Sequence, residues 1–178
     1  MKVVQRTKMV EVEEFEIGDV ISFELTTGQE VSAMAMRKEE NGMLFVFMDL
    51  LDEYIPMNRS NSTEGGYEES YLRKVLNGRI LKTFDADFVD KMIPFENGDL
   101  LRILTYTEVF GDTDGEGQLE PMKEARNRVA FKDGCTDWYW LQDVASATLF
   151  AAVAGYGCAS STGACLTYVG VRPAFLLS

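Results

Sequence analysis

The sequence predicts an α+β protein with mixed or antiparallel sheets and two main helices in its first half. Segments with strand periodicity come first, two segments with helical periodicity follow, and short strand-like segments close the chain. This order favours an α+β architecture over the alternating βαβ order of a parallel sheet. With 178 residues and 46% apolar composition, the chain can bury one sizeable core, and we expect a single domain over residues 1–178. Residues 1–16 are interpreted as an N-terminal strand or arm.

The first strands are predicted from the alternation of apolar and polar residues. Residues 20–25 and residues 30–37 alternate in this way, with a turn between them. Asn41-Gly42 is a strong hairpin signal and precedes residues 43–50, a nearly continuous apolar run. Because the run is apolar at almost every position, we expect a strand that is covered on both faces.

Two helices are expected after these strands. The first covers residues 68–77 and stops at Gly78, and the second starts at an Asp85 cap and ends before Pro94. Each carries an apolar stripe at helical spacing. The stripe residues are Tyr71, Leu72, Val75 and Leu76 in the first helix, and Phe88, Val89, Met92 and Ile93 in the second.

The remainder of the chain is divided into short elements. We expect a strand over residues 100–106, a turn of helix over 107–110, a loop over 111–117, a short helix within 120–130, and strands over 138–141, 148–153 and 166–171. Strands on both sides of a central helical region complete the α+β order.

The charge of the chain excludes several classes of partner. Its formal net charge is −12, whereas nucleic-acid binding needs clustered lysine and arginine, so we expect no nucleic-acid partner. The same charge disfavours an anionic membrane surface. The N-terminus has no apolar signal-peptide core, and glycines interrupt residues 144–171, the longest uncharged run. We therefore expect no signal peptide, no transmembrane segment, and a cytoplasmic or virion-associated protein.

Histidine and cysteine usage restricts the chemistry. The chain has no histidine, which removes Ser-His-Asp catalysis, Cys-His catalysis and the usual zinc sites. Its three cysteines are an odd number and do not form a disulfide framework. We expect Cys135, Cys158 and Cys165 to be reduced and buried.

The C-terminal quarter of the chain carries almost no charge. Between residues 134 and 178 the only aspartate, glutamate, lysine and arginine residues are Asp137, Asp143 and Arg172. A segment this poor in charge is buried, faces a partner, or does some of each. Tyrosine and small polar residues gather inside it, which is typical of adaptable binding surfaces, and an ordinary loop between strands is the alternative. These residues are Tyr139, Gln142, Ser146, Tyr156, Ser160, Ser161, Thr162 and Tyr168.

Three segments, in this order, resemble the motifs of a known family. Tyr67-Glu-Glu-Ser-Tyr-Leu-Arg-Lys-Val-Leu-Asn77 resembles a W-x-x-S-x-L-R-x-W-L-N helix, Trp138-Tyr-Trp-Leu141 a W-W-L-R-S strand, and Gly170-Val-Arg-Pro-Ala-Phe175 a closing G-V-R-P-A strand. Together they resemble a family of uncharacterised domains of gut Firmicutes and their phages. That family looks related to the C-type-lectin-like fold shared by formylglycine-generating enzymes and phage variable receptor-binding proteins. Gln142-Asp143 stands where the family usually has Arg-Ser, and Gly155-Tyr-Gly157 alters its glycine turn.

The resemblance implies a C-type-lectin-like fold whose closing strand is buried on both faces. It also implies a non-catalytic, phage- or prophage-related domain that recognises a protein or glycan through its C-terminal half. The expected ligand-binding residues are Trp138, Tyr139, Trp140, Gln142, Tyr156, Ser160, Ser161 and Thr162, and the alternative for the two tryptophans is a place in the core, which we expect for one of them. Arg73, Asn77 and Arg172 are expected to be structural, with Arg172 holding loop carbonyls or a carboxylate. The alternative for Arg172 is contact with an anionic group of the ligand.

Two further functions are compatible with the resemblance. Cys158 and Cys165 resemble the paired cysteines of formylglycine-generating copper oxidases, although six residues separate them and the accompanying motif residues are not evident. The alternative for both cysteines is a place among small core residues. The other function is that of a structural virion or assembly protein, which acts by self-association.

The acidic loop at residues 112–117 is the one candidate metal site. Asp112, Asp114 and Glu116 stand at alternate positions and supply the hard oxygen ligands that Ca²⁺ prefers. The loop is shorter than an EF-hand loop and lacks its bidentate glutamate at the right distance. A calcium site and a solvated acidic turn are the two interpretations, and no other cofactor is expected.

Overall fold

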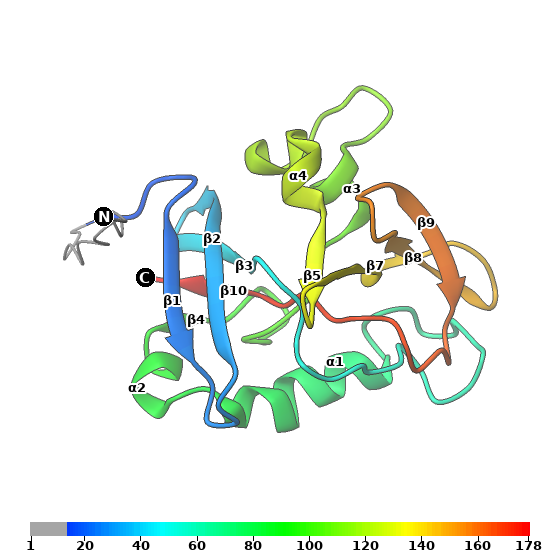
Figure 1. Cartoon of the computed structure of the whole chain (residues 1–178), viewed down its shortest axis with the longest axis horizontal. Coiled ribbons are helices and arrows are strands. Elements are labelled where there is room, and N and C mark those ends of the chain that lie inside the picture. The colour runs from blue at the N-terminus through cyan, green and yellow to red at the C-terminus, as the bar shows by residue number, and fades with distance from the viewer. Residues whose placement is uncertain (1–13) are drawn as a thin grey trace, which may run out of the picture.

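The structure is a computed structural model and describes residues 14–178, so most of the expected N-terminal strand or arm over residues 1–16 lies outside the described residues. Within residues 14–178 the strands form three sheets, and every strand pair is antiparallel. The first sheet has the order β1-β2-β3-β10-β4, the second is the hairpin β5-β6, and the third is β7-β8-β9 (Figure 1). The bounds are β1 Val20–Glu24, β2 Glu30–Glu39, β3 Gly42–Phe47, β4 Met92–Ile93, β5 Ala130–Lys132, β6 Cys135–Asp137, β7 Tyr139–Val144, β8 Leu149–Val153, β9 Ala159–Gly163 and β10 Ala174–Leu177.

The helices are short and lie mostly between β3 and β5 in the sequence. Their bounds are α1 Tyr71–Val75, the wide π-type turn η1 Leu76–Ile80, the 3-10 turn η2 Leu81–Thr83, α2 Ala86–Val89, α3 Tyr106–Phe110, the 3-10 turn η3 Glu120–Lys123 and α4 Ala125–Arg128. The first three run on from one another as a single rod along the base of the molecule, beneath the sheets (Figure 1). The predicted α+β class and the mainly antiparallel sheets are confirmed.

The core occupies both faces of the five-stranded sheet. Phe45, Phe47 and Phe175 pack on one face with apolar residues of the α1 rod, while Leu44 and Val46 pack on the other face with residues of α3 and β7. Strands β3 and β10 are therefore buried on both faces, as the apolar runs over residues 43–50 and at the C-terminus predict. The hairpin predicted from Asn41-Gly42 is also confirmed, although its turn is Glu40-Asn41 and Gly42 is the first residue of β3, where it pairs with Glu39.

Gly42 is required where it stands. A Cβ atom built on it would meet the main-chain oxygen of Leu177 and lie 2.8 Å from Cδ1 of Ile93. Residue 42 therefore has to lack a side chain for β10 to pair with β3 at this end of the sheet.

The first predicted helix has different ends in the structure. It begins at Tyr71 with the side chain of Ser70 accepting the amide of Arg73, and it does not stop at Gly78. Because Gly78 does not adopt a left-handed conformation, it makes no C-cap, and the chain continues as η1 and η2 until Phe84 turns extended.

The second predicted helix is correct at its start and too long at its end. Asp85 caps α2 by accepting the amide of Asp87, as expected. The helix ends at Val89, and Met92 lies in β4, where it pairs with Leu177.

Two predicted strands are absent among residues 14–178. Residues 100–106 make only an isolated bridge between Arg102 and Ala174, and residues 166–171 make only one between Gly170 and Tyr139. Both runs are rich in buried side chains. Their apolar pattern therefore indicates burial and not hydrogen bonding to a neighbouring strand. No helix formed by residues 14–178 is long and apolar enough to cross a membrane.

Candidate functional site

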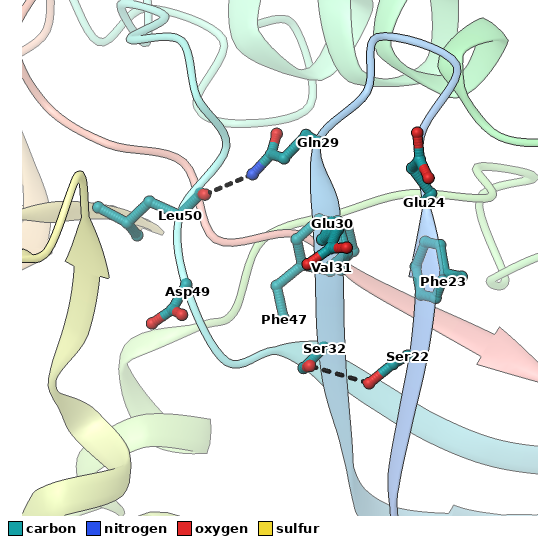
Figure 2. A pocket seen from close by; sticks show the side chains of 10 residues that line it. All are labelled: Ser22, Phe23, Glu24, Gln29, Glu30, Val31, Ser32, Phe47, Asp49 and Leu50. Carbon is teal, nitrogen blue, oxygen red and sulfur yellow. Dashed lines mark hydrogen bonds between the residues drawn. The ribbon is translucent and has the colours of Figure 1, made fainter. Parts of the chain in front are cut away.

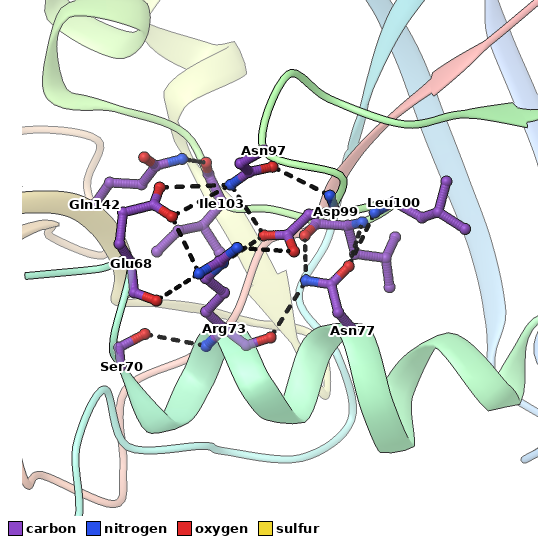
Figure 3. Close-up of polar contacts among 10 residues, drawn as sticks. Glu68, Ser70, Arg73, Asn77, Asn97, Asp99, Leu100, Ile103 and Gln142 are labelled. Carbon is purple, nitrogen blue, oxygen red and sulfur yellow. Dashed lines mark hydrogen bonds and ion pairs between the residues drawn. The ribbon is translucent and has the colours of Figure 1, made fainter.

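A polar network joins α1 to the segment that follows β4. Arg73 projects from the first turn of α1 and pairs with Asp99, with Nε 2.6 Å from Oδ2 and Nη2 3.2 Å from Oδ1 (Figure 3). One turn later Asn77 accepts the amides of Leu100 and Leu101 and donates to the carbonyl of Leu101 (Figure 3). These contacts fix an irregular segment to a helix, which is the kind of role expected for Arg73 and Asn77.

This network borders an open cleft with a volume of about 540 Å³. Its charged residues are Arg37, Glu39, Glu40, Glu68, Glu96, Arg102 and Glu108, five acids against two bases. Both bases are already neutralised, because Arg102 and Arg37 each contact the buried carboxylate of Glu108. The cleft is therefore acidic at its mouth and internally ion-paired, which stabilises the fold and leaves no free cation for a ligand.

Tyr67, which is buried, and Gln142, which is partly buried, both line this cleft. The hydroxyl of Tyr67, which lines the cleft, has no hydrogen-bond partner among the described residues, and burial raises its pKa. Gln142, an expected ligand-binding residue, also lines this cleft, and its side-chain amide donates to the carbonyl of Ile103 at 2.6 Å. The side chain of Gln142 is therefore engaged within the fold.

The expected aromatic anchors of β7 belong to the core. Tyr139 is 1% exposed and Trp140 is 0% exposed. Nε1 of Trp140 donates to the carbonyl of Ile55, and the Tyr139 hydroxyl donates to the carbonyl of Arg128. Trp138 is partly buried against the same core. The prediction that these three residues contact a ligand is therefore wrong for Tyr139 and Trp140, because consecutive β7 residues face two buried layers.

The other expected binding residues lie close in the sequence, on β9 and its flanking turns, where Ser161 faces the opposite side of the strand from Ser160 and Thr162. Tyr156 precedes the strand and is 74% exposed, and Ser161 is exposed within it. Ser160 and Thr162 are partly exposed. Tyr168, which follows the strand, is 62% exposed. We call this surface, formed by Tyr156, Ser160, Ser161, Thr162 and Tyr168, the β9 surface.

Strand β9 is also an edge of its sheet. Ala154 donates to Cys158 and Ala164 donates to Thr148, so the hydrogen-bonded pairs with β8 fall at even-numbered β9 positions. The amide and carbonyl of Ser161 therefore point away from β8, and they make no hydrogen bond within residues 14–178. This edge can accept a further strand.

Arg172 is buried between the sheets. It is 2% exposed, and its guanidinium donates to the carbonyls of Phe47 and Asn127 and to the hydroxyl of Tyr139, at 2.6, 2.9 and 3.1 Å. The side chain holds main-chain carbonyls from two distant segments, which is the structural role expected for it.

The acidic loop does not assemble a cluster of ligands. The Asp112 carboxylate accepts the amides of Asp114 and Glu116, an arrangement that shapes the turn. Among residues 14–178 no three histidine, cysteine, aspartate or glutamate side chains lie together so that they could hold a metal ion. The calcium interpretation stays a prediction without geometric support.

The cysteines are not where they were expected. Cys135 and Cys158 are exposed and Cys165 is partly buried, so the prediction of buried cysteines is wrong, although all three thiols are free. Cys158 and Cys165 lie beyond opposite ends of β9, whose five residues span about 13 Å at the usual strand rise. They are too far apart to share one ion as a paired-cysteine copper site requires.

A further hollow of about 520 Å³ lies on the outer face of β1 and β2. Figure 2 shows Ser22 and Ser32 hydrogen-bonded across the two strands, and the Gln29 side chain donating to the carbonyl of Leu50. Its charged lining residues, Glu24, Glu30 and Asp49, are all acidic. Sequence reasoning did not identify this hollow, because no motif marks the outer face of an ordinary amphipathic hairpin.

Comparisons of the chain with protein-family models, with curated proteins and with solved structures give no match.

Proposed function

We propose that this protein is a non-catalytic ligand-binding domain with a C-type-lectin-like fold, and that the β9 surface recognises a protein or glycan ligand. The observation that carries the proposal is the exposure of Tyr156 and Tyr168 at the two ends of an uncharged edge strand. The proposed phage or prophage origin rests on the sequence resemblance alone.

The composition of the β9 surface supports a neutral ligand. No charged residue occurs between positions 144 and 171, in a protein whose net charge is −12. Tyrosine rings offer apolar faces with a polar tip, and serine and threonine hydroxyls both donate and accept hydrogen bonds. This combination suits sugar rings and their hydroxyls, and it equally suits an uncharged protein segment.

The main chain of β9 supports recognition of a protein segment in particular. Because the amide and carbonyl of Ser161 point outward, an extended segment can pair with β9 and extend the sheet to a fourth strand. The same edge favours a second candidate function, self-association through β9, as proposed for a structural virion or assembly protein. Both functions use one surface and are separated by experiment.

The arrangement of the chemistry-bearing groups supports binding over catalysis. The chain has no histidine, and the two cysteines of the copper-oxidase alternative lie beyond opposite ends of β9. The buried ionised groups at the cleft are paired with one another. Breaking a pair of this kind leaves an uncompensated buried charge, which favours a structural role for these groups.

The test is a glycan array together with a pull-down from host-cell lysate, with and without Ca²⁺, on the wild type and on Tyr156→Ala. Tyr156 is exposed, so its replacement is expected to preserve the fold and to reduce ligand signal at least tenfold. Tyr106→Ala changes an exposed tyrosine outside the β9 surface and serves as the matched control. No selective ligand in either assay, or equal signal from wild type and Tyr156→Ala, would overturn the proposal.

A second variant separates strand pairing from side-chain contact. Ser161→Pro removes the outward amide of β9, which faces away from β8, so an edge position tolerates it. Loss of a protein ligand in Ser161→Pro supports sheet extension, and retention of a glycan ligand supports side-chain recognition. Light scattering over a range of concentrations, on wild type and Ser161→Pro, tests self-association through the same edge.

A further inference from the structure

We propose a second binding site, distinct from the β9 surface, that takes a small carboxylate with an apolar chain and holds its charge against Arg172. The site is the hollow between the outer face of β2 and the segment that runs from α4 into β5. Its volume is about 360 Å³, within the roughly 300–1,000 Å³ typical of small-molecule sites.

The first observation is a buried cation without a counter-ion. Arg172 forms no ion pair with any carboxylate of residues 14–178, whereas Arg73, Arg79 and Arg102 each do. Its Nε and Nη1 are bonded to carbonyl and hydroxyl oxygens, and no hydrogen bond within the described residues uses Nη2. A buried guanidinium gains most from a carboxylate, which accepts charge-assisted hydrogen bonds from it.

The second observation is that this cation lies in the wall of the hollow. Arg172 is one of the residues that line the hollow, although only 2% of it is exposed. The Arg172 side chain is already held by the carbonyls of Phe47 and Asn127. An anion that enters therefore meets a pre-positioned group, which lowers the entropic cost of binding.

Half of the lining residues are apolar and adaptable. They are Met34, Met36, Met48, Val129 and Phe131, and Phe131 is 44% exposed. Methionine side chains are flexible and polarisable and adapt to differently shaped apolar ligands. An apolar chain on the carboxylate would therefore cover surface that now faces solvent.

The charge balance of the hollow favours an anion in a protein that is otherwise acidic. Arg172 and Arg126, the latter paired with Glu124, line it against one lining carboxylate, Asp49, whose Oδ1 accepts the amide of Phe131. The neighbouring hollow on β1 and β2 shares Ser32 and Asp49 with it (Figure 2). All the charged residues that line that neighbouring hollow are acidic. The anionic end is therefore placed at Arg172, away from the acidic hollow.

The test uses hexanoate and hexylammonium, which have similar chains and opposite charge, in isothermal titration calorimetry of the full chain. We expect hexanoate to bind at least tenfold more tightly than hexylammonium. Arg172 also ties two segments of the fold together, so its removal is not the first variant. Met34→Glu places a negative charge in the wall, and Met34→Gln places a neutral side chain of the same shape there as its control.

Hexanoate binding is expected to fall at least tenfold in Met34→Glu and to persist in Met34→Gln. Circular dichroism of both variants verifies that the fold is kept. The proposal is overturned if hexanoate does not bind at millimolar concentration, if hexylammonium binds equally well, or if Met34→Glu binds hexanoate as the wild type does. Tyr156→Ala is expected to bind hexanoate normally, which keeps this site separate from the β9 surface.

Discussion

Arg102 holds Glu108 with both terminal nitrogens of its guanidinium, and each nitrogen lies 2.7 Å from a different carboxylate oxygen. Nη2 of Arg37 contacts the same carboxylate at 3.1 Å, and the amide of Thr105 donates to it. Burial, the largest single influence, would raise the pKa of Glu108, but the hydrogen bonds and charge of Arg102, together with the Thr105 amide and the charge of Arg37, hold that pKa below its usual range. Folding therefore stabilises the ionised form of this carboxyl group.

We expect part of the stability to depend on the ionisation of Glu108. A carboxyl group whose pKa is lower in the folded chain stabilises the fold fully above its unfolded pKa, about 4.3. That contribution is lost as the pH falls through the lower folded-state pKa. Urea denaturation from about pH 7 down to about pH 3 should therefore show a steeper loss for the wild type than for Glu108→Gln.

At neutral pH the Glu108→Gln variant should be less stable than the wild type by about 3 kcal/mol, because two guanidiniums lose their buried partner. Glu96→Gln is the matched control, since Glu96 is exposed at the rim of the same cleft. Its effect should stay within about 0.5 kcal/mol. Parallel pH profiles for the wild type and Glu108→Gln would show that the pair does not control acid stability.

A second prediction concerns the side chain of Asn77. Asn77→Ala leaves the amides of Leu100 and Leu101 without their acceptor in a partly buried place. We expect a loss of about 2–3 kcal/mol in the free energy of unfolding. Asn61→Ala, at an exposed loop position, should change it by less than about 0.5 kcal/mol. Similar stabilities for the two variants, measured by urea denaturation, would contradict this role.

A third prediction compares two glycines. Gly42→Ala places a methyl group against the main-chain oxygen of Leu177, so β3 and β10 have to separate locally, and we expect a loss of about 3 kcal/mol or more. Gly78 has open space around it and lies in the helical rod. Gly78→Ala should therefore raise the free energy of unfolding by about 0.5 kcal/mol. Thermal denaturation of both variants gives the comparison. A Gly42→Ala variant as stable as the wild type would mean that the main chain of Leu177 does not pack tightly against residue 42.

Local rules predicted the local features of the fold. The Asp85 cap depends on neighbouring residues only and is present, and the Asn41-Gly42 signal predicts the β2-β3 hairpin with its turn displaced by one residue from the observed Glu40-Asn41. Residues 100–106 are different, because the main-chain partners of Leu100 and Leu101 come from Asn77 and that of Arg102 from Ala174, more than twenty positions away in the sequence. A buried apolar segment has the same sequence pattern whether its amides donate to a neighbouring strand or to a side chain. Periodicity therefore could not distinguish a paired strand from an irregular buried segment.

The candidate site was predictable only in part for a similar reason. Tyr156 and Ser161 stand in a turn and on an edge strand, where composition and exposure agree. Trp140 has the same aromatic character, yet the sheet above it and the core below it enclose the ring completely. The hollow lined by Arg172 exists because β2 and the segment from α4 into β5 lie next to each other. Neither segment carries a sequence pattern that predicts this contact.

The fourth prediction concerns the accessibility of the three thiols. Cys135 and Cys158 are exposed and Cys165 is partly buried, so a thiol reagent such as DTNB should modify two cysteines of the native protein quickly and the third slowly. Cys135→Ser and Cys158→Ser should each remove one fast equivalent, whereas Cys165→Ser should remove the slow one. All three should react quickly in denaturant. If all three thiols react slowly in the native protein, the cysteines are buried as the sequence predicts. The turns on both sides of β9 would then differ from those in the structure.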